Sequence, residues 1–386
     1  MLRLYNAMTQ KKEPVPGRAG IYVCGITPYD VAHLGHASLY VFYDVLMRYM
    51  RHLGGKVSYV QNVTDIDDDM LKKAKQTGKN WKELGNENIR YFLGQMDALN
   101  MERPDIYCRA TDHIIEMIAI AKSLISKGMA YENNGNVYFS VSAFKDFGKL
   151  SKLKKSEMLS MANERGNNPA DTNKKDPLDF VLWQRSAEGE PSWASPWGKG
   201  RPGWHIECTA MAKKYLKKVA VHGGGGDLTF PHHECEIAQD PAVYRGTIWA
   251  HQAMVFYQGR KMSKSLGNLV MVEDLLKKHS VNAVRIAILL HHYREEWEFT
   301  EDGMQRAAKM NEKLNAVWNL QSGTKSFDSS TYKKEFFRLL DDDMQTGAAL
   351  HVLEKLAASM RSGQNISTAK AFLSRAFAIL GLRAEY

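Results

Sequence analysis

The chain has 386 residues, 44% of them hydrophobic and 25% charged, and its 52 Lys and Arg against 43 Asp and Glu give a formal net charge of +9. This length predicts two or three domains, and the composition is that of a soluble globular protein rather than a disordered or fibrous one. The basic excess is consistent with an anionic partner such as a nucleic acid or a nucleotide, but a solvated basic surface explains it equally well.

The cysteines exclude a small disulfide-rich secreted domain, because they are few and far apart, at Cys24, Cys108, Cys208 and Cys235. The N-terminus has no apolar segment of signal-peptide length, and the most apolar helical stretch, 114–125, is interrupted by charged residues. We therefore expect a cytoplasmic protein without a membrane span, in which free thiols bind metal, react or lie in a core.

The first part of the chain alternates between strand and helix patterns. We predict a strand at Gly20–Ile26, a helix at His36–His52 and a second strand at Lys56–Val63, joined by short turns. This succession is the unit of a parallel sheet. Helical patterns follow at about 81–98 and 111–127. These elements predict an α/β domain of the nucleotide-binding type.

The middle of the chain has a different character. Residues 129–141 predict a hairpin around Asn133-Asn134-Gly135. The polar stretch 145–175 is typical of an insertion or a mobile surface, and the Pro-, Gly- and Trp-rich stretch 183–203 indicates a structured loop.

Sheet character returns at 219–222 and 248–257. From Val272 onward the pattern is helical to the end, with a break at about 321–330. We therefore predict an α/β domain with an insertion, followed by an all-α C-terminal part.

The first motif that carries chemistry is His33-Leu34-Gly35-His36, between a strand and the start of a helix. Backbone N–H groups and the helix dipole favour phosphate there. The two imidazoles can donate hydrogen bonds to an ATP phosphate in the transition state, and Gly35 lets a flat adenine or ribose approach the backbone. Taken alone, the four residues are more often an ordinary helix start.

The second motif is Lys261-Met262-Ser263-Lys264-Ser265, a polar loop flanked by Gly259 and Gly267. Its lysines and hydroxyls can clamp a pyrophosphate leaving group, and the glycines permit closure over ATP. An exposed Lys/Ser loop is the alternative interpretation. Both motifs in this order, roughly 225 residues apart on an α/β pattern, are a much stronger signal. Together they resemble the signatures of class I aminoacyl-tRNA synthetases.

Further motifs narrow the resemblance to the cysteinyl-tRNA synthetase family. They agree in order and spacing, and they are Tyr22–Thr27, Asn62–Asp68, Gly203–Cys208, Gly223–Asp227 and Phe230–Glu234. The resemblance implies an α/β fold with a Rossmann (HUP) parallel-sheet catalytic domain, an inserted connective region and a C-terminal helical bundle. The implied units are the first catalytic half at 1–100, the insertion at 101–190, the second catalytic half at 191–250, the KMSKS loop and stem-contact region at 251–300, and the bundle at 301–386, without a full anticodon-binding domain.

The resemblance implies a zinc site formed by Cys24, Cys208, His232 and Glu236. Two thiolates, an imidazole and a carboxylate are good zinc ligands, although spacing alone leaves Cys24 as an ordinary buried strand cysteine. Zinc would bind the thiolate of a cysteine substrate, which serine and alanine cannot imitate, so an editing domain would be unnecessary. Cys235 has no assigned role, and for Cys108 we expect a place in a core.

The resemblance also assigns residues to the reaction, in which the cysteine carboxylate attacks the α-phosphorus of ATP, with Mg²⁺ on the phosphates. Trp204 would wall the cysteine pocket and Asp227 would receive the α-ammonium; a core tryptophan and a turn aspartate are the alternatives without the family. The implied catalytic residues are His33, His36, Lys261 and Lys264. Those implied on ATP are Thr27, His33, Gly35, His36 and Lys264. Those implied on cysteine or its adenylate are Cys24, Gly25, Thr27, Asn62, Thr64, Trp204, Gly225 and Asp227.

Two acceptors for the activated cysteine stay open. The short part after Ser265 resembles the cysteine ligase of mycothiol synthesis, which joins cysteine to the amine of glucosaminyl-inositol. Glu236, the net charge and the Lys-rich helices suit tRNA(Cys) instead, and we favour tRNA, with a monomeric enzyme. A silent paralogue that only binds RNA is disfavoured by the intact motifs, and a nucleotidyltransferase of the same fold by the four ligand matches.

Overall fold

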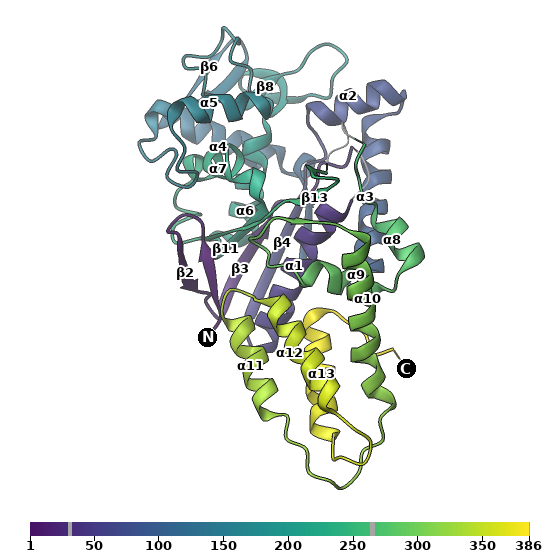
Figure 1. Cartoon of the computed structure of the whole chain (residues 1–386). Helices are drawn as coiled ribbons and strands as arrows, with labels where there is room; N and C mark the ends of the chain where they lie inside the picture. The colour runs from purple at the N-terminus through teal and green to yellow at the C-terminus, as the bar shows by residue number, and fades with distance from the viewer. Residues whose placement is uncertain (30–32, 263–266, 386) are drawn as a thin grey trace.

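A computed structural model describes residues 1–29, 33–262 and 267–385 of the chain (Figure 1). A five-stranded parallel sheet lies at the centre, with the connective insertion on one side and the helical bundle on the other (Figure 1). Its strands in spatial order are β12 (Ile248–Gln252), β11 (Val221–Gly225), β3 (Arg18–Val23), β4 (Lys56–Val63) and β5 (Ile106–Arg109). The sheet thus joins two parts of the chain that are separated by the insertion.

The central strand β3 shows why this sheet is buried. Ile21 pairs with Tyr59 of β4 on one side and with Val221 of β11 on the other, and all three are almost completely buried. The predicted strand at Gly20–Ile26 is confirmed, but it begins at Arg18 and ends at Val23. Because all five strands run parallel, their carboxyl ends share one edge, where ligand sites of open α/β sheets are found.

Helix α1 (Leu34–His52) connects β3 to β4, as the sequence predicted. It begins two residues earlier than expected, because His33 caps it with a side chain that accepts a hydrogen bond from the Gly35 N–H at 3.1 Å. The predicted helix at 81–98 is confirmed as α3 (Trp81–Ala98). Helix α2 (Asp68–Thr77), capped by Asp67, was not predicted, because only Met70 and Ala74 of its residues are buried.

The insertion folds around a second, antiparallel sheet, in the order β6 (Ala130–Asn133), β7 (Asn136–Phe139), β8 (Phe180–Arg185), β10 (Gly198–Pro202) and β9 (Trp193–Ser195). The predicted hairpin at 129–141 is confirmed. The prediction of a loop at 183–203 is wrong, because these residues form the end of β8 and strands β9 and β10. Gly200 is required by packing: a Cβ there would lie 2.3 Å from Nε1 of Trp183.

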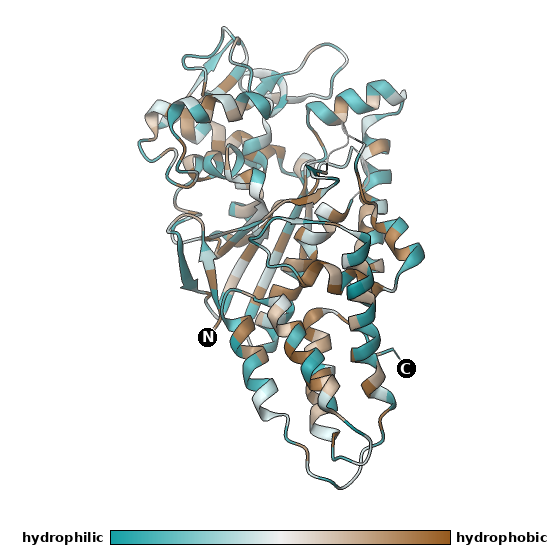
Figure 2. Ribbon diagram, viewed as in Figure 1, coloured by the Kyte–Doolittle hydropathy of each residue, from teal (hydrophilic) through white to brown (hydrophobic). Residues whose placement is uncertain are grey.

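The remaining helices surround these sheets and form the C-terminal bundle. Those of the first part are α4 (Ile114–Ser126), α5 (Lys155–Glu164), α6 (Trp204–Leu216) and α7 (His232–Gln239). Those of the second part are α8 (Val272–Lys278), α9 (Val281–Leu289), α10 (Glu301–Ala316), α11 (Ser330–Asp341), α12 (Thr346–Ser359) and α13 (Ser367–Leu380). Figure 2 shows α9 as strongly hydrophobic and the outer face of α10 as hydrophilic, which matches the burial of nearly all of α9.

Short strands complete the fold: β1 (Arg3–Asn6) with β2 (Lys11–Pro14), and β13 (Val255–Tyr257) with β14 (Arg260–Lys261) and β15 (Trp297–Glu298). The all-α prediction from Val272 onward holds apart from β15. Within the described parts of the chain, no helix has both the length and the apolar character that a membrane span needs.

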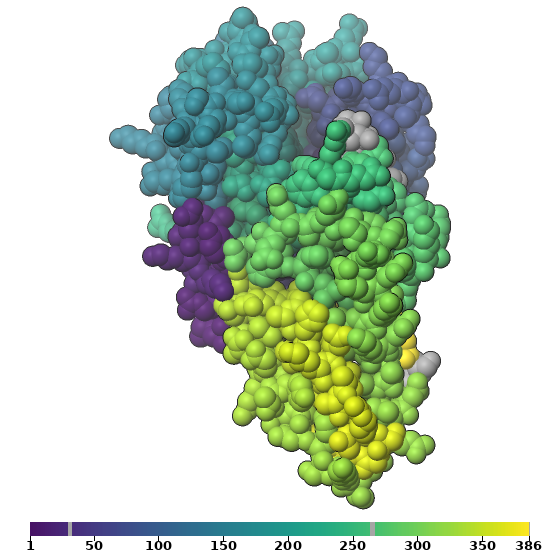
Figure 3. Space-filling model, viewed as in Figure 1, coloured from purple at the N-terminus to yellow at the C-terminus, as the bar shows by residue number. Residues whose placement is uncertain are grey.

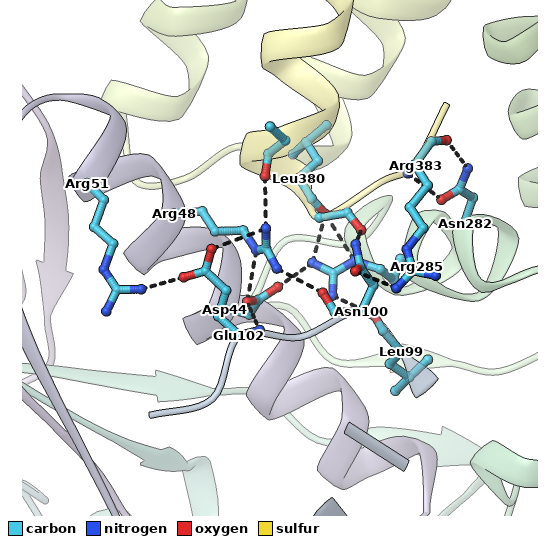
Figure 4. Close-up of polar contacts among 12 residues, drawn as sticks. Asp44, Arg48, Arg51, Leu99, Asn100, Glu102, Asn282, Arg285, Leu380 and Arg383 are labelled. Atoms are coloured by element: carbon cyan, nitrogen blue, oxygen red, sulfur yellow. Dashed lines mark hydrogen bonds and ion pairs between the residues drawn. The ribbon is translucent and has the colours of Figure 1, made fainter. Parts of the chain in front are cut away.

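A buried ion pair fastens the bundle to the central domain (Figure 4). Arg285 of α9 and Asp44 of α1 are both almost completely buried, and Nη2 of the arginine lies 2.6 Å from Oδ2 of the aspartate. The same guanidinium donates hydrogen bonds to the carbonyl oxygens of Leu380 and Leu99. Arg48 holds the second oxygen of Asp44 at 2.9 Å. The end of α13 is therefore attached to α1 through polar contacts that are shielded from water.

Candidate functional site

Four buried side chains that can ligate a metal meet beyond the carboxyl end of the central sheet. Cys24 follows β3, Cys208 lies on α6, and His232 and Glu236 lie one turn apart on α7. Sγ of Cys24 lies 3.7 Å from Sγ of Cys208, and Nε2 of His232 lies 3.4 Å from Sγ of Cys208 and 3.3 Å from Oε1 of Glu236. The structure thus brings together all four residues that the family resemblance implies as ligands.

Within the described residues, a second combination, Cys24, His222, His233 and Glu236, also has its possible ligand atoms within 4.8 Å of one another. The two combinations share Cys24 and Glu236, so they describe alternative positions for a single ion. The first combination offers two thiols and the second only one. His222 is already engaged at 2.9 Å by the outer oxygen of Glu236. We therefore take the first combination as the candidate metal centre.

The candidate metal centre is held in shape by polar neighbours to which the sequence analysis gave no role. The Tyr244 hydroxyl donates to Oε2 of Glu236 at 2.6 Å, and Nε2 of His222 lies 2.9 Å from the same oxygen. These contacts leave Oε1 facing the ligand cluster. On the other side, Nδ1 of His205 lies 3.0 Å from Nδ1 of His232, which leaves Nε2 of His232 facing Cys208.

Burial sets the protonation of this cluster. It raises the pKa of the Cys24 and Cys208 thiols and lowers the pKa of His232 to about 3, so the imidazole is neutral and can ligate a metal. Burial alone would raise the pKa of Glu236, but its contacts with His222, His232 and the Tyr244 hydroxyl outweigh burial and lower that pKa. The buried thiols deprotonate when a dication binds.

A cavity of about 1210 Å³ opens beside the metal centre, between the insertion and the start of α2. Figure 3 shows the hollow between these two parts of the surface. Trp204 lines it with a partly buried ring that stacks on His232 at 4.4 Å between centroids, so it is not a core tryptophan. Thr27, Asp227 and Lys261 also line the cavity. The cavity therefore reaches Trp204 and His205, which pack against His232, while the four candidate ligands lie buried behind them.

The His33-Leu34-Gly35-His36 motif lies at the N-terminus of α1, as predicted. The backbone N–H of His33 donates to Nδ1 of His36 at 3.3 Å, and the two rings lie 4.2 Å apart. A Cβ on Gly35 would come within 2.8 Å of the His33 ring, so a larger residue here would displace the ring that caps α1. The motif has the N-terminal helix position that favours phosphate.

Lys261 forms an ion pair with Asp227, with 3.0 Å between Nζ and Oδ2. Lys264, the other lysine of the motif, lies outside the described residues. At Gly225, a Cβ would lie 2.5 Å from Oδ1 of Asp227, so the glycine makes room for that carboxylate.

Three other predicted residues lie together where β3 and β4 end. The N–H of Gly25 donates to Oδ1 of Asn62 at 2.8 Å, and Nδ2 of Asn62 lies 3.4 Å from Oγ1 of Thr64. A Cβ on Gly25 would collide with the Asn62 carbonyl, at 1.6 Å. Their contacts with a substrate stay a prediction, as do those of Thr27.

The two cysteines outside the predicted ligand set differ in their surroundings. Cys108 lies in a core, as expected, with Sγ 3.4 Å from Sδ of Met211, and burial raises its pKa to about 12. Cys235 is also buried and, among the described residues, belongs to neither metal combination.

Arg165, at the C-terminal end of α5, is a further residue whose position the sequence analysis missed. Its Nη1 donates to the carbonyl oxygens of Asp227 and Phe230. It thereby connects the insertion to the segment between β11 and α7. Backbone acceptors that lie 62 and 65 residues away leave no trace in a sequence pattern. His205, by contrast, lies beside Trp204 in a motif that the sequence displays.

Solved structures show which fold the chain has. The chain is similar to methionyl-tRNA synthetase of Mycobacterium tuberculosis in complex with methionyl-adenylate, with a TM-score of 0.66 and 13% identity over 94% of this chain and 88% of that one. It is similar to arginyl-tRNA synthetase of Thermus thermophilus, with a TM-score of 0.59 and 13% identity over 98% and 84% of the two chains. At this identity the likeness shows the fold alone, and the fold is that of the class I synthetases.

Sequence comparison identifies the family within that class. Residues 10–309 match the family model of the tRNA synthetases class I (C) catalytic domain. A cysteine–tRNA ligase of Thermococcus onnurineus is 43% identical over 374 residues, covering 90% of this chain and 78% of the relative. One of Idiomarina loihiensis is 44% identical over 367 residues, covering 92% and 79%. The chain belongs to the cysteinyl-tRNA synthetase family, as the motifs indicated.

Proposed function

We propose that this protein activates L-cysteine with ATP as cysteinyl-adenylate and transfers the cysteine to tRNA(Cys). The observation that carries the proposal is the candidate metal centre, with its two thiols, directly behind the wall of a substrate-sized cavity. Amino-acid activation needs such a cavity next to a nucleotide site. The N-terminus of α1 offers the nucleotide site, because backbone N–H groups there favour phosphate.

Zinc is the ion that suits the four ligands best. The separations within the candidate metal centre, from 3.3 to 3.8 Å, are those between neighbouring ligands of a tetrahedral ion with bonds of about 2.0–2.3 Å. When bound, zinc supplies a soft Lewis acid for the thiolate of the substrate. Such a contact selects cysteine over serine and alanine, so no editing step is needed.

The chain's own residues orient the rest of the substrate. Asp227 receives the α-ammonium, and Trp204 closes the wall beside His232. Thr64 and Asn62, with Gly25, Thr27 and Gly225, border the cysteine and its adenylate. The substrate carboxylate is thereby directed at the α-phosphorus of ATP, where attack forms the mixed anhydride and releases pyrophosphate.

The nucleotide contacts form the second half of the proposal. Thr27, Gly35 and the imidazoles of His33 and His36 contact ATP, and the imidazoles hydrogen-bond its phosphates as charge develops. Lys261 and Lys264 neutralise the departing pyrophosphate together with Mg²⁺, which accompanies ATP.

The names of the relatives favour tRNA over an amino sugar as the acceptor. The basic net charge of +9 adds support, because a polyanion is attracted to it. The buried free cysteines suit a reducing cytoplasm. We also propose a monomer, which sedimentation of the purified protein tests.

The deciding experiment offers two acceptors in parallel. The purified protein is incubated with labelled cysteine, Mg²⁺-ATP and either a tRNA(Cys) transcript or glucosaminyl-inositol. We expect label on the tRNA and none on the sugar. Product on the sugar alone would overturn the choice of acceptor, and absence of cysteine-dependent ATP–pyrophosphate exchange would overturn the activation step itself.

A further inference from the structure

The carboxylate that we assign to the substrate ammonium already holds another ammonium group. Nζ of Lys261 lies 3.0 Å from Oδ2 of Asp227, and both side chains line the large cavity. Their side chains are 47% and 37% exposed, so the pair lies at the mouth of the cavity and is open to exchange. Lys261 also begins the motif that we assign to the phosphates of ATP.

Asp227 is the fixed partner in this ion pair. Nη1 of Arg165 contacts the carbonyl oxygens of Asp227 and Phe230, which fastens the backbone of this segment to the insertion. Oδ1 of Asp227 lies against Gly225, where a Cβ would approach within 2.5 Å. Oδ2 is therefore the oxygen that faces an incoming ligand, and it is the oxygen that Lys261 occupies.

Lys261 is the movable partner, because its long stem ends in a half-exposed ammonium. Its backbone is held in place: its carbonyl accepts a hydrogen bond from Nδ2 of Asn268 at 3.2 Å, and that amide also donates to the Tyr257 carbonyl at 3.0 Å. The flexible stem can swing its ammonium away from Asp227 without any change in the sheet.

We propose that the α-ammonium of cysteine displaces Lys261 from Asp227 and thereby releases the lysine for the phosphates of ATP. This inference rests on the proposed function, since it assumes that Asp227 receives the substrate ammonium. Two ammonium groups at one carboxylate oxygen repel each other, so cysteine and Lys261 exclude each other there. Cysteine binding then increases the affinity for ATP, and linkage requires that ATP increases the affinity for cysteine by the same factor.

Binding without catalysis tests the exchange. The affinity for L-cysteine is measured by calorimetry in the absence of ATP, for the zinc-loaded wild type and for Lys261→Met. We expect the variant to bind cysteine about two- to fivefold more tightly, because it has no internal competitor. 3-Mercaptopropionate keeps the thiol and the carboxylate but lacks the ammonium, so its affinity should be the same for both proteins.

The same variant tests the coupling to the nucleotide. Saturating cysteine should tighten the binding of α,β-methylene-ATP, which cannot be cleaved, in the wild type, and this enhancement should disappear in Lys261→Met. Lys174→Met is the matched control, because it removes the same charge from the same cavity without touching Asp227; it should leave cysteine affinity unchanged.

The two possible failures look different. If Lys261→Met binds cysteine as the wild type does or more weakly, or if Lys174→Met tightens cysteine binding equally, the exchange is refuted while the proposed function stands. If the zinc-loaded wild type binds no cysteine at all, the proposed function itself fails.

Discussion

The Nδ1 atoms of His205 and His232 lie 3.0 Å apart, so one imidazole donates to the other at the edge of the candidate metal centre. Burial lowers the pKa of both rings to about 3, which leaves one proton to share between these two nitrogens. Nε2 of His232 is thereby directed at the cluster. His205 is not itself a candidate ligand, but it fixes the orientation of the one imidazole among the four.

This relationship predicts the effect of replacing His205. His205→Ala should lower the affinity for zinc by about 10- to 100-fold, because His232 loses the partner that orients it. His205→Gln, which keeps a hydrogen-bonding side chain, should lose less. Competition with a chromophoric chelator measures both affinities. Equal zinc affinity in wild type and His205→Ala would contradict the orienting role.

Replacing a ligand should have a larger effect. We expect Cys208→Ala to lose bound zinc and cysteine-dependent ATP–pyrophosphate exchange together, because three ligands remain and one is a carboxylate. Metal content and exchange are measured on the same preparation. Cys108→Ala is the control, since that buried thiol lies outside the cluster, and it should retain both. Normal exchange in metal-free Cys208→Ala would refute the metal assignment.

The buried pair of Asp44 and Arg285 should dominate the attachment of the bundle. Arg285→Met leaves the Asp44 carboxylate with only one of its two arginines and removes the donor to Leu380 and Leu99, so we expect a loss of about 3–5 kcal/mol in the free energy of unfolding. Urea titration measures it. Arg338→Met breaks an exposed pair with Glu335 and should cost far less than Arg285→Met. Similar losses in the free energy of unfolding in both variants would contradict the importance assigned to the buried pair of Asp44 and Arg285.

Asp67 should make stability depend on pH. Burial raises its pKa from 3.8 to about 6, with Asp68 and Asp69 adding to the rise. A carboxyl with a raised folded-state pKa stabilises the protein while it is protonated, so this contribution is present below about pH 4 and is lost as pH rises to about 6.

Asp67→Asn places a neutral side chain at this position, so it removes that loss. It also keeps the cap of α2, because its side-chain oxygen can still accept the hydrogen bond that the Met70 N–H donates to Asp67 at 2.7 Å. Relative to wild type, the variant should therefore gain about 1–3 kcal/mol more at pH 7 than at pH 4. Urea titrations at the two pH values give the difference. If the stability difference between the variant and the wild type is the same at both pH values, the raised pKa of Asp67 has no influence on stability.

The sequence predicted the elements whose pattern is local. Helix α3 and strand β4 match their predicted bounds to the residue, because their apolar residues follow one period throughout. Strand β10 was missed because its glycines, which let it pack against Trp183, are also typical of loops. Helix α2 was missed because it buries so little.

The candidate site also has a part that the sequence predicted and a part that it did not. Its four metal ligands lie in motifs that a family resemblance picks out, although they come from three separate segments. The contact of Arg165 with backbone carbonyls and the exchangeable pair of Asp227 and Lys261 depend on how the insertion and the sheet meet in space. No periodicity or spacing in the sequence encodes those contacts.

Helix α1 has a mechanical consequence. Its first turn carries His36 at the nucleotide end, and its later turns carry Asp44 and Arg48, which hold α9 and the end of α13. Nineteen residues make a rod about 28 Å long with no break in it. Under the proposed function, a tRNA bound at the bundle and ATP bound near His36 would therefore contact opposite ends of one rigid helix, so binding of the acceptor can affect the ATP chemistry without any loop between them.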